Sequence, residues 1–112
     1  MRKITRRGLI KKLDTLFAAK VREIGFCQHC GSKNNLQCAH IFSRKNLSVR
    51  WDPENAVCFC YRCHFYWAHR NPIEYTEWVK QFKDIGVLQF RIAHAKPIKM
   101  FDLEAKLVEL TK

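Results

Sequence analysis

The pattern of apolar and polar residues predicts a long amphipathic helix near the amino terminus. Apolar side chains recur there every three or four residues, at Leu9, Leu13, Leu16 and Phe17. This spacing places them on one face of a helix, where they would pack into a core. Thr5 has the hydroxyl group of a good N-cap, and Gly25 is a typical helix end. The sequence therefore predicts a helix over about residues 5–24.

Two further helices are predicted in the carboxyl-terminal half. Pro72 suits the first turn of a helix. The apolar residues that follow keep helical spacing, at Tyr75, Trp78, Val79 and Phe82. We therefore predict a helix over about 73–82, with Gly86 as a break after it. Residues 87–95 fit a strand or a helix, whereas the last stretch predicts an amphipathic helix over about 101–110.

The middle of the chain has the pattern of a short hairpin followed by a helix. Residues 36–41 and 56–59 are predicted as two strands, because both are apolar-rich and lie beside turn-forming residues. The segment between them, 42–54, is polar and is predicted as a loop. A helix is expected after the second strand, ending near Arg70.

Length and composition favour a single domain. The chain has 112 residues, enough for one ordinary domain and too few for two. No repeat, low-complexity linker or shift in composition divides it. We predict one α+β, mostly helical domain over 1–112, with its core at 27–75 and helices flanking that core. A domain this small would gain useful stability from a bound metal.

Two pairs of cysteines with the same spacing bound the central stretch. Two residues separate Cys27 from Cys30, and two separate Cys60 from Cys63. This spacing lets both thiolates of a pair bind one metal at about 2.3 Å, and two such pairs complete a tetrahedral zinc site. The sequence therefore predicts a structural Zn²⁺ on these four residues. Cys58 is close enough to compete with Cys60, but it lacks the same spacing to Cys63.

The number of cysteines raises the question of whether the protein is secreted or cytoplasmic. Six cysteines would also suit disulfides in a secreted protein. However, no apolar stretch of signal-peptide length follows the basic start, and no apolar run reaches the roughly 20 residues of a membrane span. We therefore expect a cytoplasmic protein with metal-bound thiolates and no membrane insertion. Cys38 and Cys58 are predicted as small buried residues on the two strands.

The chain is strongly basic. Its 21 Lys and Arg outnumber 10 Asp and Glu, and the formal net charge is +11. Such a charge favours a polyanionic partner, nucleic acid first and an anionic membrane surface second. One basic group lies at Arg2, Lys3, Arg6, Arg7, Lys11 and Lys12, and it also fits a solvated face. Another group is close to His40 and supplies the candidate nucleic-acid contacts, Arg44, Lys45 and Arg50.

Two histidines supply the candidate chemistry. His40 lies on a predicted strand before the polar loop, and His64 directly follows a predicted zinc ligand. A neutral imidazole is both a good metal ligand and a good general base near neutral pH. If the two rings face one another across the hairpin, one can activate water while the other holds a divalent metal against a phosphate. The alternative is that each is an ordinary hydrogen-bonded histidine.

These residues together resemble the HNH endonuclease signature in its zinc-clamped form. The signature residues are, in order, His40, Asn55, Cys60, Cys63 and His64. Similarity to the NinG-type recombination endonucleases of lambdoid phages extends to the stretches 39–44, 51–55 and 71–75. The match covers about residues 27–75, under half of the chain. The combined motif is specific, although each element alone is not.

The resemblance implies a ββα-metal fold, in which two strands and a helix grip a catalytic cation and a zinc ion holds the finger. It implies that His40 is the general base and that His64 ligates Mg²⁺ or another divalent cation. Asn55 would orient His40. The substrate would be DNA, cut to 3′-hydroxyl and 5′-phosphate ends in phage recombination or DNA processing in the host cytoplasm. A homodimer would allow both strands to be cut.

Ala39 departs from the family pattern. Many members carry Asp or His directly before the catalytic histidine as a metal ligand, and alanine has no donor atom. His69 is the first candidate substitute, but it would lie about 500° around a regular helix from His64, so a distorted helix or a helix end is required. Cys38 is the second candidate, and its thiolate would favour a softer metal than Mg²⁺.

Three functions stay open at this point. The first is a metal-dependent DNA endonuclease. The second is a non-catalytic, zinc-stabilised module that binds nucleic acid through its charge, with Ala39 marking lost activity. The third is a zinc-stabilised protein-interaction domain that uses the aromatic carboxyl-terminal half of the chain.

Overall fold

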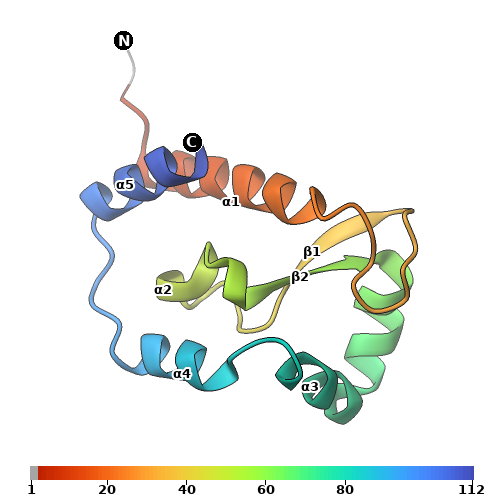
Figure 1. Ribbon diagram of the computed structural model, residues 1–112. Coiled ribbons are helices and arrows are strands. Elements are labelled where there is room, and N and C mark those ends of the chain that lie inside the picture. The colour runs from red at the N-terminus through yellow and green to blue at the C-terminus, as the bar shows by residue number, and fades with distance from the viewer. Residues whose placement is uncertain (1–2) are drawn as a thin grey trace.

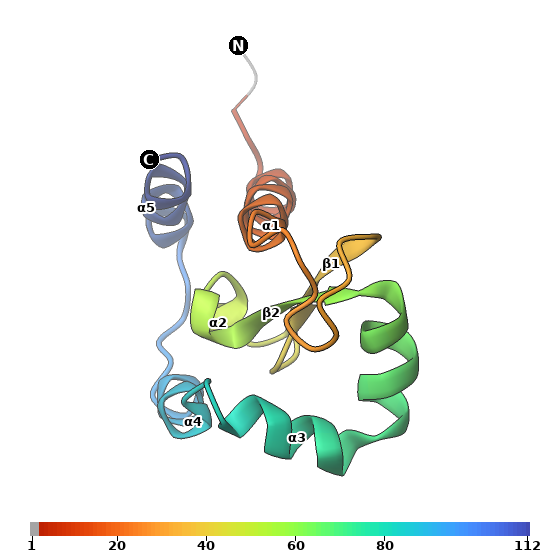
Figure 2. The ribbon, with the colours of Figure 1, turned by 45° about the vertical axis from the view of Figure 1, so that its right-hand side comes forward.

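The computed structural model describes residues 3–112 and shows a small α+β fold, mostly helical, around a two-stranded antiparallel sheet (Figure 1). Residues 1 and 2, and with them Arg2 of the basic group, lie outside the described part. The elements in order are α1 (Arg6–Arg22), β1 (Leu36–His40), α2 (Leu47–Arg50), η1 (Pro53–Asn55), β2 (Ala56–Cys60), η2 (Arg62–Ala68), α3 (Pro72–Lys80), α4 (Ile85–Ala93) and α5 (Met100–Leu110). Helix α5 lies beside α1 in both views, so the first and the last described helix are neighbours (Figures 1 and 2).

Helix α1 forms where the stripe of apolar residues predicted a helix. The Thr5 hydroxyl accepts a hydrogen bond from the Gly8 N–H at 3.0 Å, which satisfies one of the free donors of the first turn. Gly25 has a φ of +85°, a conformation that favours glycine, and it follows the end of the helix. The buried stripe comprises Leu9, Leu13, Phe17 and Val21. It packs against Leu103 and Leu110 of α5, so both ends of the chain share one apolar cluster.

Both faces of the hairpin are covered, which explains why β2 is buried along its whole length. Successive side chains of a strand point to opposite faces. Ala56 and Cys58 accordingly pack into the cluster with α1, whereas Val57 and Phe59 pack into a second cluster with aromatic residues of η2 and α3. A strand buried on both sides needs no polar alternation, and this agrees with the apolar sequence predicted as the second strand.

The predicted loop between the strands contains two short helical turns, α2 and η1, that the sequence pattern did not reveal. Val49 of α2 is fully buried, and it anchors the turn to the protein. The Asp52 carboxylate accepts a hydrogen bond from the Glu54 N–H at 3.0 Å and caps η1. Elements of three or four residues are too short to show a period, so only these local contacts define them.

The carboxyl-terminal half is helical throughout. Helix α3 ends at Lys80, and residues 87–93 of the ambiguous stretch belong to helix α4. Asp84 begins α4, because its carboxylate accepts a hydrogen bond from the Val87 N–H at 3.0 Å. Gly86 therefore lies inside the first turn of α4. The prediction that it marks the break after the preceding helix was wrong, because that break falls between Lys80 and Ile85. None of the described helices has the length and apolar character needed to cross a membrane.

Candidate functional site: a cysteine cluster beside a histidine cavity

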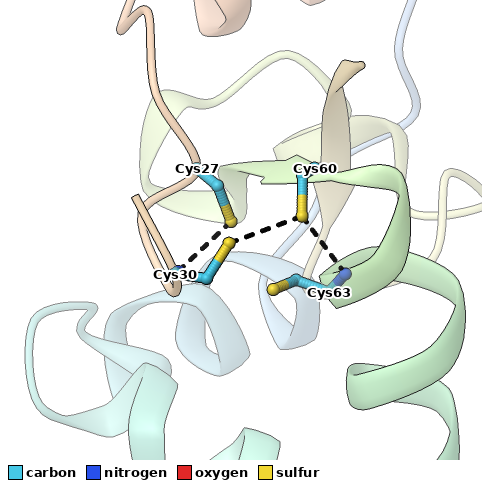
Figure 3. A group of neighbouring side chains, drawn as sticks. All are labelled: Cys27, Cys30, Cys60 and Cys63. Carbon is cyan, nitrogen blue, oxygen red and sulfur yellow. Dashed lines mark hydrogen bonds between the residues drawn. The ribbon is translucent and has the colours of Figure 1, made fainter. Parts of the chain in front are cut away.

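The four cysteines of the two predicted pairs converge on one point. Their sulfur atoms all lie within 4.8 Å of one another, and Figure 3 shows them turned toward a common centre. The sulfurs of Cys30 and Cys60 are 3.6 Å apart. Four thiolates at 2.3 Å from a tetrahedral zinc would be separated by about 3.8 Å, so the donor set fits that ion. The prediction that these residues can hold a structural metal such as zinc is confirmed.

The backbone supports each pair of cysteines in the same way. The Cys30 N–H points at the Cys27 sulfur at 3.5 Å, and the Cys63 N–H points at the Cys60 sulfur at 3.4 Å. Burial acts to raise the pKa of Cys27, but surrounding backbone N–H groups outweigh it and bring the pKa down to about 7. The first turn closes through Gly31, whose φ of +82° favours glycine. The backbone contacts thus favour the thiolate form of Cys27, the form that a metal requires, whereas burial and the neighbouring thiols raise the pKa of Cys63.

His29 lies against this cluster, although it was not singled out from the sequence. Its Nδ1 is 3.2 Å from the Cys63 sulfur, and its ring stacks on Trp67 with centroids 3.6 Å apart. The two other cysteines stay apart from the cluster. Cys58 is buried beside α1 and pairs across the hairpin with Cys38, which is half-buried.

His40, the last residue of β1, is held by a backbone carbonyl. Its Nε2 is 2.8 Å from the carbonyl oxygen of Arg50. Because a carbonyl can only accept, Nε2 carries the hydrogen of the neutral ring and Nδ1 keeps its lone pair. Burial lowers the pKa of His40 below its ordinary value, and the positive charge of Arg44 adds to this. The ring is therefore neutral at pH 7, with a free nitrogen able to accept a proton.

Asn55 is fully buried and ties the loop together. Its Oδ1 accepts a hydrogen bond from the Phe42 N–H at 2.7 Å. Its Nδ2 donates to the carbonyls of Phe42 at 3.2 Å and Val49 at 3.1 Å. Val49 precedes Arg50, whose carbonyl holds His40. Asn55 therefore fixes the segment that orients the imidazole, through side-chain hydrogen bonds to Phe42 and Val49.

His64 and His69 come together because η2 is a π-helix. Hydrogen bonds from residue i to i+5 widen the turn, so residues five apart approach one another as they would not on an α-helix. The two ring centroids are 5.8 Å apart. His64 Nδ1 lies 2.8 Å from the Gln37 side-chain oxygen, which leaves Nε2 with the lone pair. The helix distortion that the sequence argument required is thus present.

His40, His64 and His69 line one cavity of about 340 Å³. Its wall includes Ala39, Phe59 and Tyr75, and no carboxylate lines it. A second cavity of about 380 Å³ also borders His40 and His64, and Cys38 lies on its wall. Burial raises the pKa of Cys38 to about 11, so this thiol is protonated near neutral pH.

The three candidate basic residues differ in their surroundings. Arg50 donates to both oxygens of the Asp14 carboxylate, through Nε at 2.9 Å and Nη2 at 2.6 Å. Its side chain is only 17% exposed, whereas that of Arg44 is 62% exposed and 3.9 Å from the same carboxylate. Lys45 is exposed as well. Arg44 and Lys45 are therefore accessible to a phosphate, while Arg50 is already committed to an ion pair.

Asp14 and Gln37 are site residues that the sequence argument missed. Asp14 also accepts a hydrogen bond from the Trp51 indole N–H at 2.9 Å, so it joins α1 to the segment that holds His40. Burial opposes its ionisation, but its bonds to Arg50 and Trp51 prevail and lower the pKa of Asp14. One signal was available, because Asp14 is the only acidic residue in the basic helix α1. Gln37 gave no comparable signal.

Arranged in this way, the chain offers a four-thiol metal site and, on the helix that follows it, two imidazoles beside a neutral histidine with a free nitrogen. Such a set can bind a second cation and can take a proton from water. Comparison with protein-family models, with curated proteins and with solved structures found no match to this chain.

Proposed function

We propose that the protein is a metal-dependent endonuclease of the HNH type that hydrolyses phosphodiester bonds in DNA. The observation that supports this most strongly is that His40, from the end of β1, and His64, from the start of η2, line the same cavity. The hairpin, the following helix and the four-cysteine cluster have the order expected of a zinc-clamped ββα-metal fold. The strongly basic composition suits a polyphosphate substrate.

In this proposal His40 is the general base. Its Nδ1 takes a proton from the attacking water, and the Arg50 carbonyl keeps the ring in the tautomer that this step needs. The lowered pKa of His40 keeps the ring deprotonated before the reaction. Asn55 acts through the loop by holding the Val49 carbonyl, so it is a positioning residue and not a catalytic one.

His64 and His69 are the residues that would hold the catalytic cation. When bound, a divalent ion would stabilise negative charge on the phosphate and on the departing 3′ oxygen. Imidazole donors suit transition metals, whereas Mg²⁺ prefers carboxylates and carbonyls, and no carboxylate lines this cavity. We therefore expect Mn²⁺, Co²⁺ or Ni²⁺ to support cleavage better than Mg²⁺. Exposed Arg44 and Lys45 would contact neighbouring phosphates.

Nicking of supercoiled plasmid by the zinc-loaded protein tests the proposal. With added Mn²⁺, wild type should nick the plasmid, and His40→Ala should be slower by about 10²–10⁴-fold because the general base is lost. The variant should keep its zinc, its thermal unfolding profile and its affinity for DNA. His94→Ala is the matched control, because His94 is an exposed histidine on the end of α4. Equal cleavage by wild type and His40→Ala would remove His40 from the mechanism.

The second candidate function is a non-catalytic, zinc-stabilised module that binds nucleic acid. Ala39 favours it, because this buried residue lies on the wall of the cavity where the resembling family often has a metal ligand. The same assay separates the two functions. Metal-independent DNA binding without cleavage, under every divalent ion tried, would favour the module.

A further inference from the structure

Three large aromatic side chains remain exposed on η2 and on the residue that caps its start. Tyr61 and Tyr66 are each 47% exposed, and Phe65 is 44% exposed. The rings pack against one another. The ring centroids are 4.8 Å apart for Tyr61 and Phe65 and 5.9 Å apart for Tyr61 and Tyr66. Neither apolar cluster of the protein includes them. A group of half-exposed rings on a small protein indicates an interaction surface.

Positive charge accompanies these rings. The Arg70 guanidinium lies over the Tyr66 ring, 5.0 Å from its centroid. Arg62 is exposed on the same helix, and no Asp or Glu occurs between Glu54 and Glu74. We call Tyr61, Phe65, Tyr66 and Arg70 the aromatic patch. Flat rings with guanidinium groups and no acid are the combination that binds bases by stacking and phosphates by charge.

The aromatic patch is continuous with the histidine cavity. The Phe65 ring is 4.5 Å from the His64 ring and 5.9 Å from the His69 ring, measured between centroids. Phe65 therefore lies between the exposed tyrosines and the two imidazoles that would hold the catalytic cation. A nucleic-acid strand with its phosphate in the cavity would have neighbouring nucleotides within reach of the patch.

We propose that the aromatic patch binds unpaired bases of single-stranded DNA next to the phosphodiester that is cut. This inference rests on the proposed nuclease function and specifies its substrate. In a duplex each base is stacked between its neighbours, so a protein ring can reach a base face only where the strands are open. The patch therefore selects single-stranded or locally unpaired DNA over continuous duplex.

The test is binding of a fluorescent oligothymidylate of about ten nucleotides, followed by anisotropy. All proteins carry His40→Ala and are zinc-loaded, so the strand is not cut. Tyr61→Ala and Tyr66→Ala should each weaken binding by about tenfold, the typical loss of one stacking ring. Tyr66→Phe keeps the ring and should bind like its parent. The control Phe101→Ala removes an exposed ring on α5, on the other side of the molecule from η2 (Figures 1 and 2), and should change affinity by less than about twofold.

Salt dependence separates stacking from charge. Tyr66→Ala should leave the slope of log affinity against log salt unchanged, whereas Arg70→Ala should reduce it by roughly 0.7 for one lost phosphate contact on a single strand. Continuous duplex of the same length should bind less tightly than the single strand, and the tyrosine substitutions should not affect it.

Several results would overturn the inference. These are unchanged single-strand affinity in Tyr61→Ala and Tyr66→Ala, equal losses on duplex, or tighter binding of the matching RNA strand. Self-association that both substitutions abolish would assign the patch to a second copy of the chain. The two proposals fail separately. If the wild type nicks plasmid but the tyrosine substitutions leave single-strand binding unchanged, only the proposed role of the aromatic patch is disproved. If the patch binds single strands but the protein does not cleave DNA, only the proposed nuclease function is disproved.

Discussion

The cysteine cluster and the histidine cavity use the same hairpin but are built in opposite ways. Leu36 pairs with Cys60 at one end of the sheet, and His40 pairs with Ala56 at the other. The cluster has four donors of one kind within 4.8 Å, a set that is complete for zinc. The cavity is lined by histidines, and in the proposed site two imidazoles would be the donors, with room for water and substrate. Closed metal sites stabilise folds, whereas open sites can do chemistry.

The link between the two regions is short. Cys63 belongs to the cluster and His64, the next residue, belongs to the cavity. Any metal that fixes Cys63 therefore also fixes the start of η2. In this arrangement zinc binding would position the imidazole without touching the substrate.

Removing one thiol should unfold the domain. Zinc binding supplies roughly 10 kcal/mol or more in small zinc folds, which exceeds the total stability of many domains. Cys30→Ser should lose the zinc and the cooperative thermal transition, as followed by metal analysis and circular dichroism. The control Cys38→Ser changes a half-buried cysteine outside the cluster and should keep the zinc. Full zinc occupancy in Cys30→Ser would mean that the cluster is not the metal site.

Removing the Asn55 amide should damage the cavity while leaving the cluster intact. Asn55→Ala leaves the N–H and the carbonyl of Phe42 without these partners, and the Val49 carbonyl keeps only its hydrogen bond from the Asp52 N–H at 3.2 Å. We expect a loss of about 3 kcal/mol in the free energy of unfolding and slower plasmid nicking, with zinc retained. The control Asn46→Ala removes a single bond to the Ser43 carbonyl in the same loop and should cost less than about 1 kcal/mol. Similar losses in both variants would contradict the bracing role.

Asp14→Asn should have a smaller effect on the same segment. It removes the charge that holds the partly buried Arg50 guanidinium, and the unfolding free energy should fall by about 1–2 kcal/mol in denaturant titrations. Glu77→Gln is the control, because its ion pair with Lys80 is exposed and should contribute less than about 0.5 kcal/mol. If cleavage slows in Asp14→Asn but not in Glu77→Gln, the ion pair positions His40.

The pH dependence of cleavage should show the smallest effect. The pKa of His40 is lowered below 6.5 chiefly by burial, so the neutral base persists below pH 6.5 and is lost only as pH falls further. The Asp14 charge acts in the other direction and raises this pKa, so Asp14→Asn should move the acidic limb of the rate profile to lower pH. A limb that moves to higher pH would contradict the electrostatic account.

The two regions also differ in how far the sequence predicted them. The cysteine cluster could be predicted from the spacing of its residues. Each pair sits in a turn formed by neighbouring residues, and a tetrahedral zinc ion needs the four donors that two pairs supply. Helix α1 follows from its stripe and from the Thr5 cap for the same local reason. The helical state of 87–93 did not follow from periodicity, and the Asp84 cap that begins α4 was overlooked.

The cavity depends on contacts that spacing does not encode. His69 reaches His64 only because η2 winds as a π-helix, and an α-helical pattern would have separated them. Asp14 and Arg50 are far apart in the chain, so their ion pair exists only once α1 packs on the hairpin. The positions of His40 and His64 in the sequence made them candidates, and the resemblance added Asn55 and a role for each. The carbonyl that fixes the tautomer of His40 is visible only in the structure.

Our central proposal is that a second, open metal site on His64 and His69 serves His40 in cutting DNA. Its most direct test is the rate of plasmid nicking by zinc-loaded protein as Mn²⁺ is titrated, for wild type and His64→Ala. We predict saturable, Mn²⁺-dependent nicking by wild type, and at least about a tenfold rise in the Mn²⁺ concentration needed by the variant. Identical titration curves, or no nicking by wild type at any Mn²⁺ concentration, would contradict this account.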